Sequence, residues 1–596
     1  MENTNGISIL YGSETGNAHD YAQYLSRRLR YFLIEPTLAS MDDFPLKNLI
    51  TSTKYLIVIC STTGQGELPH NSKKFMKFLL KKKLPQDLLG HIRITSFGIG
   101  DSSYPKFNYA IKKIHARLMQ LGCQELSARC EADELSPEGI DGYYKEWEGK
   151  VIAALQLHIP RMVEVDDSIL LPPENPIIIS ENASNVDTIL QHKALVLSRN
   201  QDGMKVGKIK LNKRITLIDH FQDVRHILIE SNDLDYSPGD TVALYPCNDD
   251  TSVEILMRLQ PHWIPYADKP LEIGNTVPSI PGGFIEKLNL TLRSLFKYHL
   301  DIQSIPRRSF FMLLWHFCDS SSEDGAREQE KLKEFSRIEE SEELYNYANR
   351  PRRLILETVL EFQQNLKIPI EYVFDLFPTI KPRLFLIASK PSQNFIEIVV
   401  AIVEYKTIIR RIRRGLCSKW LKLLKEGDQI TISVHRSGLR FQLSDIPPPP
   451  IIMVAPGTGV APMKSLIEDI SLKHSGQELH LFYGCRYKDK DFLFSDRWQQ
   501  LSKSESFHIY PCFSRDLSSG PKYVQHELFN KKMLIGDLIL NKNAIVFVCG
   551  SSGSMPREVR ITLVEILSSF RNMSTQDADG YLLSMEGSGR YKQETW

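Results

Sequence analysis

Apolar strands alternate with amphipathic helices at both ends of this chain of 596 residues, and this pattern constrains the fold most. Near the N-terminus it predicts strands at 6–11, 55–60, 92–98 and about 124–129. Near the C-terminus, the stretches "IIMVAPGTG", "LHLFYGCR", "FHIYPCFSRD" and "AIVFVCGSS" each precede a predicted helix. Regular strand–helix alternation favours a doubly wound parallel sheet, so we expect one such α/β module at each end.

The part between these modules reads differently. From about residue 189 it is rich in strand patterns, which a charged, helix-like section interrupts. "PPPP" marks a boundary before the C-terminal module, because proline fixes the backbone and gives no hydrogen bond to a sheet. The predicted organisation is therefore a first α/β module at 1–152, a proline-rich linker at 153–188, a β-barrel at 189–447 with a helical insertion at about 246–370, and a second α/β module at 448–596.

Charge and composition exclude several functions. Lys and Arg number 73 and Asp and Glu 72, so nothing indicates binding to nucleic acid or to an anionic membrane. The N-terminus lacks the pattern of a signal peptide, and no apolar run approaches the roughly 18 residues of a membrane helix. Nine scattered cysteines without a Cys-x-x-Cys pair argue against a zinc site or a disulfide framework. We therefore expect a cytoplasmic protein without metal, membrane anchor or nucleic-acid partner.

The first predicted site lies where the strands of the N-terminal module end. "SETGNA", "STTGQGE" and "GDSSYPKFN" follow three of its strands, and ligands of such sheets bind at that edge. Ser13, Thr15 and Asn17 offer polar side chains, Gly16 admits close approach, and the following helix adds free N–H groups. Without a lysine, the loop suits a terminal phosphate monoester rather than a triphosphate. Any one of these loops alone could be an ordinary helix cap.

These loops resemble the flavodoxin-like, FMN-binding module of the NADPH-dependent diflavin reductase family. The resemblance implies that residues 13–18 hold the FMN phosphate and that the other loops surround the flavin ring, with Tyr104 stacking on it. Thr63 stands where many relatives have a second stacking aromatic. The implied FMN residues are Ser13, Glu14, Thr15, Gly16, Asn17, Ala18, Ser61, Thr62, Thr63, Gly64, Ile99, Gly100, Asp101, Ser102, Ser103, Tyr104, Pro105, Lys106, Phe107, Asn108 and Asp133.

The second predicted site lies in the barrel. "RLFLIAS" and "RRGLCSKWL" resemble the FAD-binding pair of ferredoxin-reductase-like barrels, although the first alone would pass as a buried strand. The guanidinium of Arg383 can bind phosphate, the ring of Phe385 can pack on a flavin, and the helix after Gly415 can face a pyrophosphate. Leu386 replaces a family serine near the reactive flavin nitrogen. The FAD candidates are Arg350, Arg383, Leu384, Phe385, Leu386, Gly415, Leu416, Cys417, Ser418 and Trp596.

The third predicted site lies in the C-terminal module. "APGTGVAP" joins a strand to a helix as a dinucleotide-like loop, and "FSRDLSSGPKYVQ" supplies cations that suit the extra phosphate of NADPH. A charged surface turn is the alternative for the second stretch. Lys522 lies one position later than the family lysine. The NADPH candidates are Thr458, Arg486, Ser514, Arg515, Lys522, Tyr523, Val524, Gln525 and Glu558.

Three residues are catalytic candidates through the resemblance alone. In the family, a cysteine matching Cys549 faces the nicotinamide, an acid matching Glu594 assists hydride transfer, and a terminal aromatic matching Trp596 covers the FAD ring. A lone buried cysteine is more often inert packing. Ser551 stands two residues after that cysteine, where the family often has an acid.

Together the three sites predict an electron relay from NADPH through FAD and FMN to a one-electron acceptor. "TTGQGE", "NRPRR", "GLCS" and the "ETW" end resemble the branch of the family that reduces anamorsin-type iron–sulfur proteins in cytosolic iron–sulfur cluster assembly. One rival keeps the relay but serves a soluble haem protein or a sulfite-reductase partner. Another is a catalytically weakened flavoprotein scaffold, favoured by Leu386, Ser551 and the displaced Lys522.

Several acids fall in the predicted flavin loops, namely Glu14, Glu67, Asp101, Glu131, Asp133 and Glu134. They predict an acidic rim that docks a basic patch on the acceptor, with scattered solvated charge as the alternative.

Overall fold

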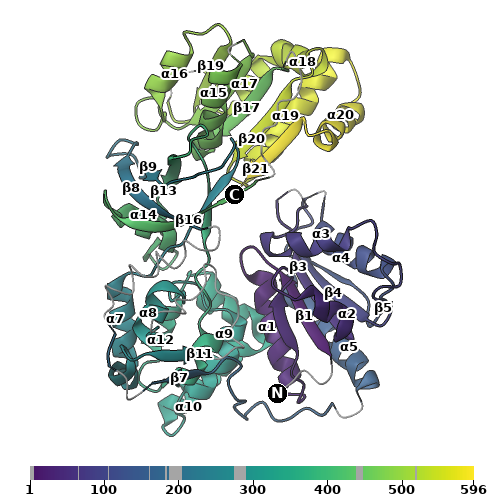
Figure 1. Cartoon of the computed structure of the whole chain (residues 1–596), viewed down its shortest axis with the longest axis vertical. Helices are drawn as coiled ribbons and strands as arrows, with labels where there is room; N and C mark the ends of the chain where they lie inside the picture. The colour runs from purple at the N-terminus through teal and green to yellow at the C-terminus, as the bar shows by residue number, and fades with distance from the viewer. Residues whose placement is uncertain are drawn as a thin grey trace.

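A computed structural model describes residues 6–64, 66–104, 106–159, 162–180, 184–186, 204–273, 290–437, 448–474, 476–516 and 520–595. Its elements form an N-terminal α/β module, a barrel-like sheet, a helical insertion and a C-terminal α/β module. Figure 1 shows the N-terminal module, in purple and blue, beside the teal insertion, with the C-terminal end of the chain near the middle of the molecule.

The N-terminal module, here called the head, is a parallel sheet with the strand order β2-β1-β3-β4-β5, and β6 also pairs with β4. Apolar side chains bury against helices on both faces, which gives the head two apolar cores. Its strands are β1 (Ile7–Gly12), β2 (Thr37–Ser40), β3 (Tyr55–Ser61), β4 (Arg93–Gly100), β5 (Gln124–Glu125) and β6 (Cys130–Asp133). Its helices are α1 (Asn17–Arg30), α2 (Leu46–Thr51), α3 (Lys73–Leu79), α4 (Tyr109–Gln120) and α5 (Gly139–His158).

The middle of the chain forms an antiparallel sheet with the order β12-β10-β16-β8-β9-β13. An isolated bridge between Ile387 and Ile398 joins the two ends of this order, which matches the predicted barrel. Its strands are β8 (Lys205–Arg214), β9 (Val224–Glu230), β10 (Thr241–Leu244), β12 (Arg383–Leu386), β13 (Phe395–Ala401) and β16 (Gln429–His435), with the small pair β14 (Glu404–Lys406) and β15 (Ile412–Arg414) and the helix α14 (Leu416–Leu423) beside it.

The insertion is helical, as the charged sequence pattern predicts, and it encloses its own aromatic-rich core around Trp263, Phe296 and Phe377. Its helices are α7 (Asp250–Leu259), α8 (Leu292–Tyr298), α9 (Arg308–Leu314), α10 (Glu323–Ser336), α11 (Ser341–Leu344), α12 (Ile355–Glu361) and α13 (Val373–Leu376).

The C-terminal module is a parallel sheet with the order β19-β18-β17-β20-β21. Its strands are β17 (Ile451–Pro456), β18 (Leu479–Cys485), β19 (Phe507–Phe513), β20 (Ile545–Gly550) and β21 (Tyr591–Thr595). Its helices are α15 (Val460–Lys473), α16 (Ser495–Leu501), α17 (Val524–Asn530), α18 (Lys532–Leu540), α19 (Ser554–Arg571) and α20 (Thr575–Gly587).

The described part of the predicted linker is anchored to the insertion. α5 continues to His158, past the boundary predicted at residue 152. Farther on, Tyr372 donates to the carbonyl of Leu171 at 2.8 Å, and the strand β7 (Ile177–Ile179) pairs with β11 (Leu271–Ile273). The strand pattern "KALVLSRN" at 193–200 lies outside the described residues.

Among the residues that the structure describes, no helix combines the length and the apolar character needed to cross a membrane.

Candidate functional site

The loop between β1 and α1 is built to leave a helix end open. Ser13 is buried, and its hydroxyl accepts a hydrogen bond from the N–H of Gly16 at 3.0 Å. Gly16 precedes α1 with a φ of 102°, a left-handed conformation that glycine adopts without strain. No side chain caps α1, so the N–H groups of its first turn point into the loop without an intrahelical acceptor. This arrangement suits an anionic group.

Two cations from outside the head lie against this loop. Arg307, which immediately precedes α9 of the insertion, donates to the carbonyl of Thr15 at 2.9 Å and to Oδ1 of Asn17 at 2.8 Å. A Cβ placed on Gly16 would lie 3.1 Å from Nη2 of Arg307 and 3.4 Å from Nζ of Lys381. Sequence analysis missed both residues, because they are far from the loop in the chain and belong to no motif.

The other two loops of the head meet at the same edge of the sheet. The N–H of Thr62 donates to the carbonyl of Ile99 at 2.9 Å, and the N–H of Ser102 donates to Asp133 at 3.0 Å. Tyr104 is 43% exposed, so its ring is available for stacking. The candidates after β3, at the end of β4 and before α4 therefore lie together, except Pro105, which lies outside the described residues.

Asn108 holds the third loop from below. It is fully buried at a φ of 54°, where it precedes α4, and its amide donates to the carbonyl of Ala132 at 2.9 Å. Its Oδ1 is buried and has no hydrogen-bond partner among the described residues. Its side chain therefore supports the loop beneath the surface.

The acids of the predicted rim are partly engaged within the head. Glu131 pairs with Lys112 at 2.9 Å and with Arg129 at 2.7 Å. Glu14 accepts a hydrogen bond from the N–H of His70 at 2.9 Å. Burial, then the nearby carboxylates Asp101 and Asp133, raise the pKa of Glu134.

In the barrel, β12 and the start of α14 carry the second candidate set. Gly415 precedes α14, which no side chain caps, and the hydroxyl of Ser418 accepts from the N–H of Val403 at 3.0 Å. Arg383 is exposed and donates to the carbonyl of Lys381 at 2.9 Å. Phe385 and Leu386 are half-buried, whereas Leu384 is 44% exposed. Cys417 is buried within the barrel core.

Arg350 lies exposed on the insertion, apart from this set. Within the described residues its side chain makes no ion pair or hydrogen bond.

The loop between β17 and α15 packs directly on β20. Gly457 has a φ of 58°, and a Cβ placed on Gly459 would lie 2.0 Å from the carbonyl oxygen of Cys549. Only glycine fits at residue 459, and Thr458 stands between the two glycines, half-buried. As at α1, no side chain caps α15.

The predicted cationic set follows β19. Main-chain bonds of 2.9 Å join Ser514 to Cys485 and Arg515 to Arg486. The guanidinium of Arg486 lies 3.8 Å from the ring centre of Phe221, while Arg515 is exposed. The later candidates differ in exposure: Lys522 and Tyr523 are exposed, Gln525 is half-buried, and Val524 is buried in the apolar core. Glu558 is exposed on α19.

Cys549 and Glu594 are register partners on the parallel strands β20 and β21. Burial, followed by the charge of Glu594, raises the pKa of the Cys549 thiol, so the thiol stays protonated. Burial, and then repulsion by Glu67 of the head, raise the pKa of Glu594 to about 7. Trp596, the third catalytic candidate and an FAD candidate, lies outside the described residues.

A cleft of about 770 Å³ separates the head from β21. The head contributes Glu67, Lys73 and Lys106 to its lining, and β21 contributes Lys592 and Glu594. The FMN candidate Lys106 and the catalytic candidate Glu594 therefore face one space.

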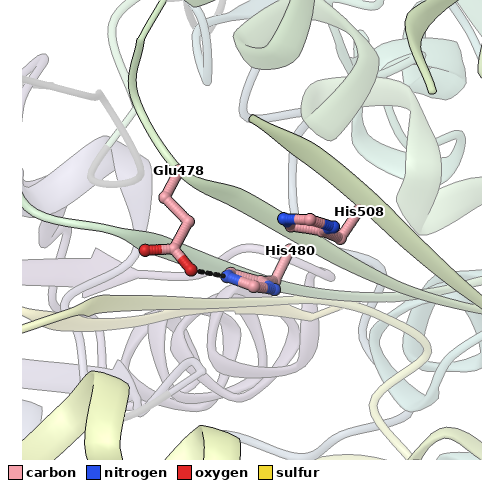
Figure 2. Close-up of side chains that lie close together, drawn as sticks. All are labelled: Glu478, His480 and His508. Atoms are coloured by element: carbon pink, nitrogen blue, oxygen red, sulfur yellow. Dashed lines mark hydrogen bonds and ion pairs between the residues drawn. The ribbon is translucent and has the colours of Figure 1, made fainter. Parts of the chain in front are cut away.

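A Glu–His–His cluster lies elsewhere on the C-terminal sheet (Figure 2). His480 lies beside His508, and its two ring nitrogens contact Glu478 at 2.9 Å and the hydroxyl of Tyr510 at 3.2 Å. Lys542 lies 3.1 Å from the other oxygen of Glu478. Because the ligand atoms of Glu478 and His480 already have partners, we interpret the cluster as a structural polar network.

Three family models match the chain in sequence order. The flavodoxin model matches residues 9–147, the FAD binding domain model 204–420, and the oxidoreductase NAD-binding domain model 453–560. A Debaryomyces hansenii protein named NADPH-dependent diflavin oxidoreductase 1 is 64% identical over 99% of this chain and 99% of its own length. Proteins of the same name from Candida albicans and Saccharomyces cerevisiae are 57% and 41% identical, each over 100% of both chains.

Proposed function

The chain belongs to the family of NADPH-dependent diflavin oxidoreductases, and from this premise we propose which residues hold its cofactors and which acceptor it serves. It is an oxidoreductase that uses NADPH, FAD and FMN, and its flavodoxin, FAD-binding and NAD-binding domains follow one another along the chain. When bound, NADPH supplies a hydride, FAD takes up both electrons, and FMN releases them singly.

The head residues fit FMN. The uncapped start of α1 and the cations Arg307 and Lys381 suit its phosphate, and the exposed ring of Tyr104 suits its flavin ring. We assign the phosphate to residues 13–18 and the ring to the loops after β3 and β4.

The other two sites fit their cofactors in the same way. The uncapped start of α14 and the exposed guanidinium of Arg383 suit the pyrophosphate of FAD. In the C-terminal module, the uncapped start of α15 suits the pyrophosphate of a dinucleotide, and exposed Arg515 suits the extra phosphate of NADPH.

Glu594 and Cys549 carry the proposed hydride-transfer site. The pKa of Glu594, about 7, allows its carboxyl to hold or release a proton near neutral pH. Cys549, which is fully buried, keeps a neutral thiol beside that carboxyl. At the strand ends the pair thus has one group whose charge changes near neutral pH, the Glu594 carboxyl, and one group that stays neutral, the Cys549 thiol.

The proposed acceptor is an anamorsin-type iron–sulfur protein of cytosolic cluster assembly, which implies a cytoplasmic location. The single observation that supports a one-electron acceptor of protein size is the position of the proposed FMN loops on a head that has an apolar core of its own and is joined to the rest by a linker. The sequence motifs that resemble this branch of the family support the iron–sulfur class.

An acceptor titration tests this proposal. Purified holoenzyme is mixed with NADPH and with an anamorsin-type protein, a soluble haem protein or a sulfite-reductase haemoprotein, and NADPH oxidation is followed. We expect saturable turnover with the iron–sulfur protein at the lowest concentration. Preference for either haem protein would replace the proposed acceptor and leave the relay intact.

A flavin count tests the relay itself. Released flavins should contain FAD and FMN in equal amounts, and NADPH should reduce ferricyanide faster than NADH does. Colourless protein, or yellow protein that NADPH cannot reduce, would support the scaffold rival.

A further inference from the structure

The contact between the head and the insertion runs through the proposed phosphate loop. α1 lies against α9, and Arg307 reaches across to the carbonyl of Thr15 and to Asn17 (Figure 1). Other bonds in the same interface are remote from the loop: Arg308 binds Asp141 at 2.6 Å, and Lys145 pairs with Glu339 at 3.5 Å. Arg307 is therefore an interface residue that also faces a ligand site.

The charges at this contact do not balance. Arg307 and Lys381 form no ion pair with a carboxylate within the described residues, unlike Arg308 and Lys145. The acid that acts on Lys381 is Glu14, whose carboxylate binds the N–H of His70. Burial, followed by repulsion from Arg307 and Arg383, lowers the pKa of Lys381 to about 8.

The neighbouring His19 is neutral and does not change the charge at this contact. It is half-buried on α1, and burial followed by Lys381, Arg307 and Arg27 lowers its pKa to about 3. A neutral imidazole adds no repulsion to the two cations and no attraction either. The nearby acids are engaged elsewhere, since Asp20 accepts from Ser309 and Glu14 accepts from the N–H of His70. The contact thus holds an open helix N-terminus and two cations that no described carboxylate pairs with, which suits an anion with two negative charges.

We propose that Arg307 and Lys381 complete the FMN phosphate site from outside the head, so that bound FMN holds the head against the insertion, the closed position. This inference rests on the proposed location of FMN in the head. The phosphate is then shared between two modules, and FMN affinity and head closure strengthen each other. The ion pairs of Arg308 and Lys145 hold the interface with or without FMN.

The test uses full-length protein from which FMN has been removed. FMN affinity is measured from the quenching of its fluorescence, and closure from the radius of gyration in X-ray scattering, with and without FMN. Arg307→Gln and Lys381→Gln should each weaken FMN binding by about tenfold or more, because each removes one charge-assisted contact. Both should also reduce the compaction that FMN causes.

Lys145→Gln is the matched control, because it removes a cross-module ion pair away from the loop. It should leave FMN affinity within about twofold of wild type. Arg307→Lys, which keeps the charge, should recover part of the affinity. FAD content and thermal unfolding report whether each variant folds. If Arg307→Gln does not fold, Lys381→Gln and Arg307→Lys test the shared phosphate site in its place.

Two outcomes separate this inference from the proposed function. If wild-type protein binds no FMN, the assignment of the head fails. If wild-type protein binds FMN but Arg307→Gln and Lys381→Gln bind it equally well and compact equally, the shared site is wrong and the relay stands.

Discussion

Glu594 lies beside Cys549 in the register of the parallel strands β21 and β20, and Glu67 of the head adds its charge to the surroundings of Glu594. The protonation of one carboxyl therefore depends both on the strand pair that carries the proposed hydride-transfer site and on the position of the head.

Replacing Glu594 by glutamine should change the pH dependence of flavin reduction. The carboxyl of Glu594 ionises near pH 7, so the rate of flavin reduction in the wild type should change its dependence on pH, a bend in the profile, near that value. Glu594→Gln should remove that bend and lower the rate of reduction by NADPH about 100-fold. Stopped-flow absorbance of the flavin between pH 5.5 and 9 measures both. An unchanged profile in the variant would exclude Glu594 as the titrating group.

The same substitution should affect stability with a defined sign. The pKa of Glu594 is raised from 4.5 to about 7 on folding, so the folded state binds more protons between these values. The contribution of Glu594 to stability is thus greatest below pH 4.5, is lost as pH rises to about 7, and is constant above. Denaturant unfolding should show Glu594→Gln gaining relative to wild type over that window. A constant difference across it would contradict the burial of this carboxyl.

Removing the guanidinium of Arg515 should reduce the preference for NADPH over NADH. Arg515→Ala should raise the KM for NADPH about tenfold or more and leave that for NADH nearly unchanged, because one charge-assisted bond to the extra phosphate is lost. Steady-state ferricyanide reduction measures both constants. Lys522→Ala, one position from the family lysine, should have the smaller effect, and equal losses with both nucleotides would contradict the assignment.

A methyl group on Gly459 should disturb the C-terminal module. The added Cβ would lie 2.0 Å from the carbonyl oxygen of Cys549, so Gly459→Ala should cost about 1–3 kcal/mol in the free energy of unfolding. Gly580→Ala is the control, because among the described residues no atom outside the local backbone of α20 lies within 4 Å of its Cβ position. It should be neutral or slightly stabilising, since alanine favours a helix more than glycine does. Equal stability of the two variants would show that β20 can yield to the loop.

Charge reversal on the head tests the acidic rim. Glu67→Lys with Glu134→Lys should slow electron delivery to the acceptor and weaken its dependence on salt, as expected when a docking attraction is lost. Glu565→Lys on α19, far along the chain in the C-terminal module, is the control. Unchanged delivery at low and high salt would leave these acids as ordinary surface charge.

The sequence predicts the sheets well because their signal is local. The strands expected at 55–60 and 92–98 are β3 (Tyr55–Ser61) and β4 (Arg93–Gly100), and the family models match the three predicted domain types. The pairing of β7 with β11 has no local signal, since each strand has three residues and they lie in different segments.

The candidate sites divide in the same way. Loops at strand ends can be found from their residues, and the register of β20 and β21 places Cys549 beside Glu594. Arg307 and Lys381 could not be found, because their relation to residues 13–18 exists only once the head rests on the insertion. The assignment of individual residues to each cofactor stays a prediction.

The anchoring of the linker at Leu171 sets a limit on travel. From the end of α5 to that anchor the chain has about a dozen residues, which span at most roughly 40 Å when fully stretched. While this contact holds, a head that leaves the insertion stays tethered to it by this short segment. Its rebinding is therefore intramolecular, at an effective concentration in the millimolar range. The proposed acceptor must therefore take each electron close to the rest of the enzyme. It competes for the head with the insertion, which belongs to the same chain.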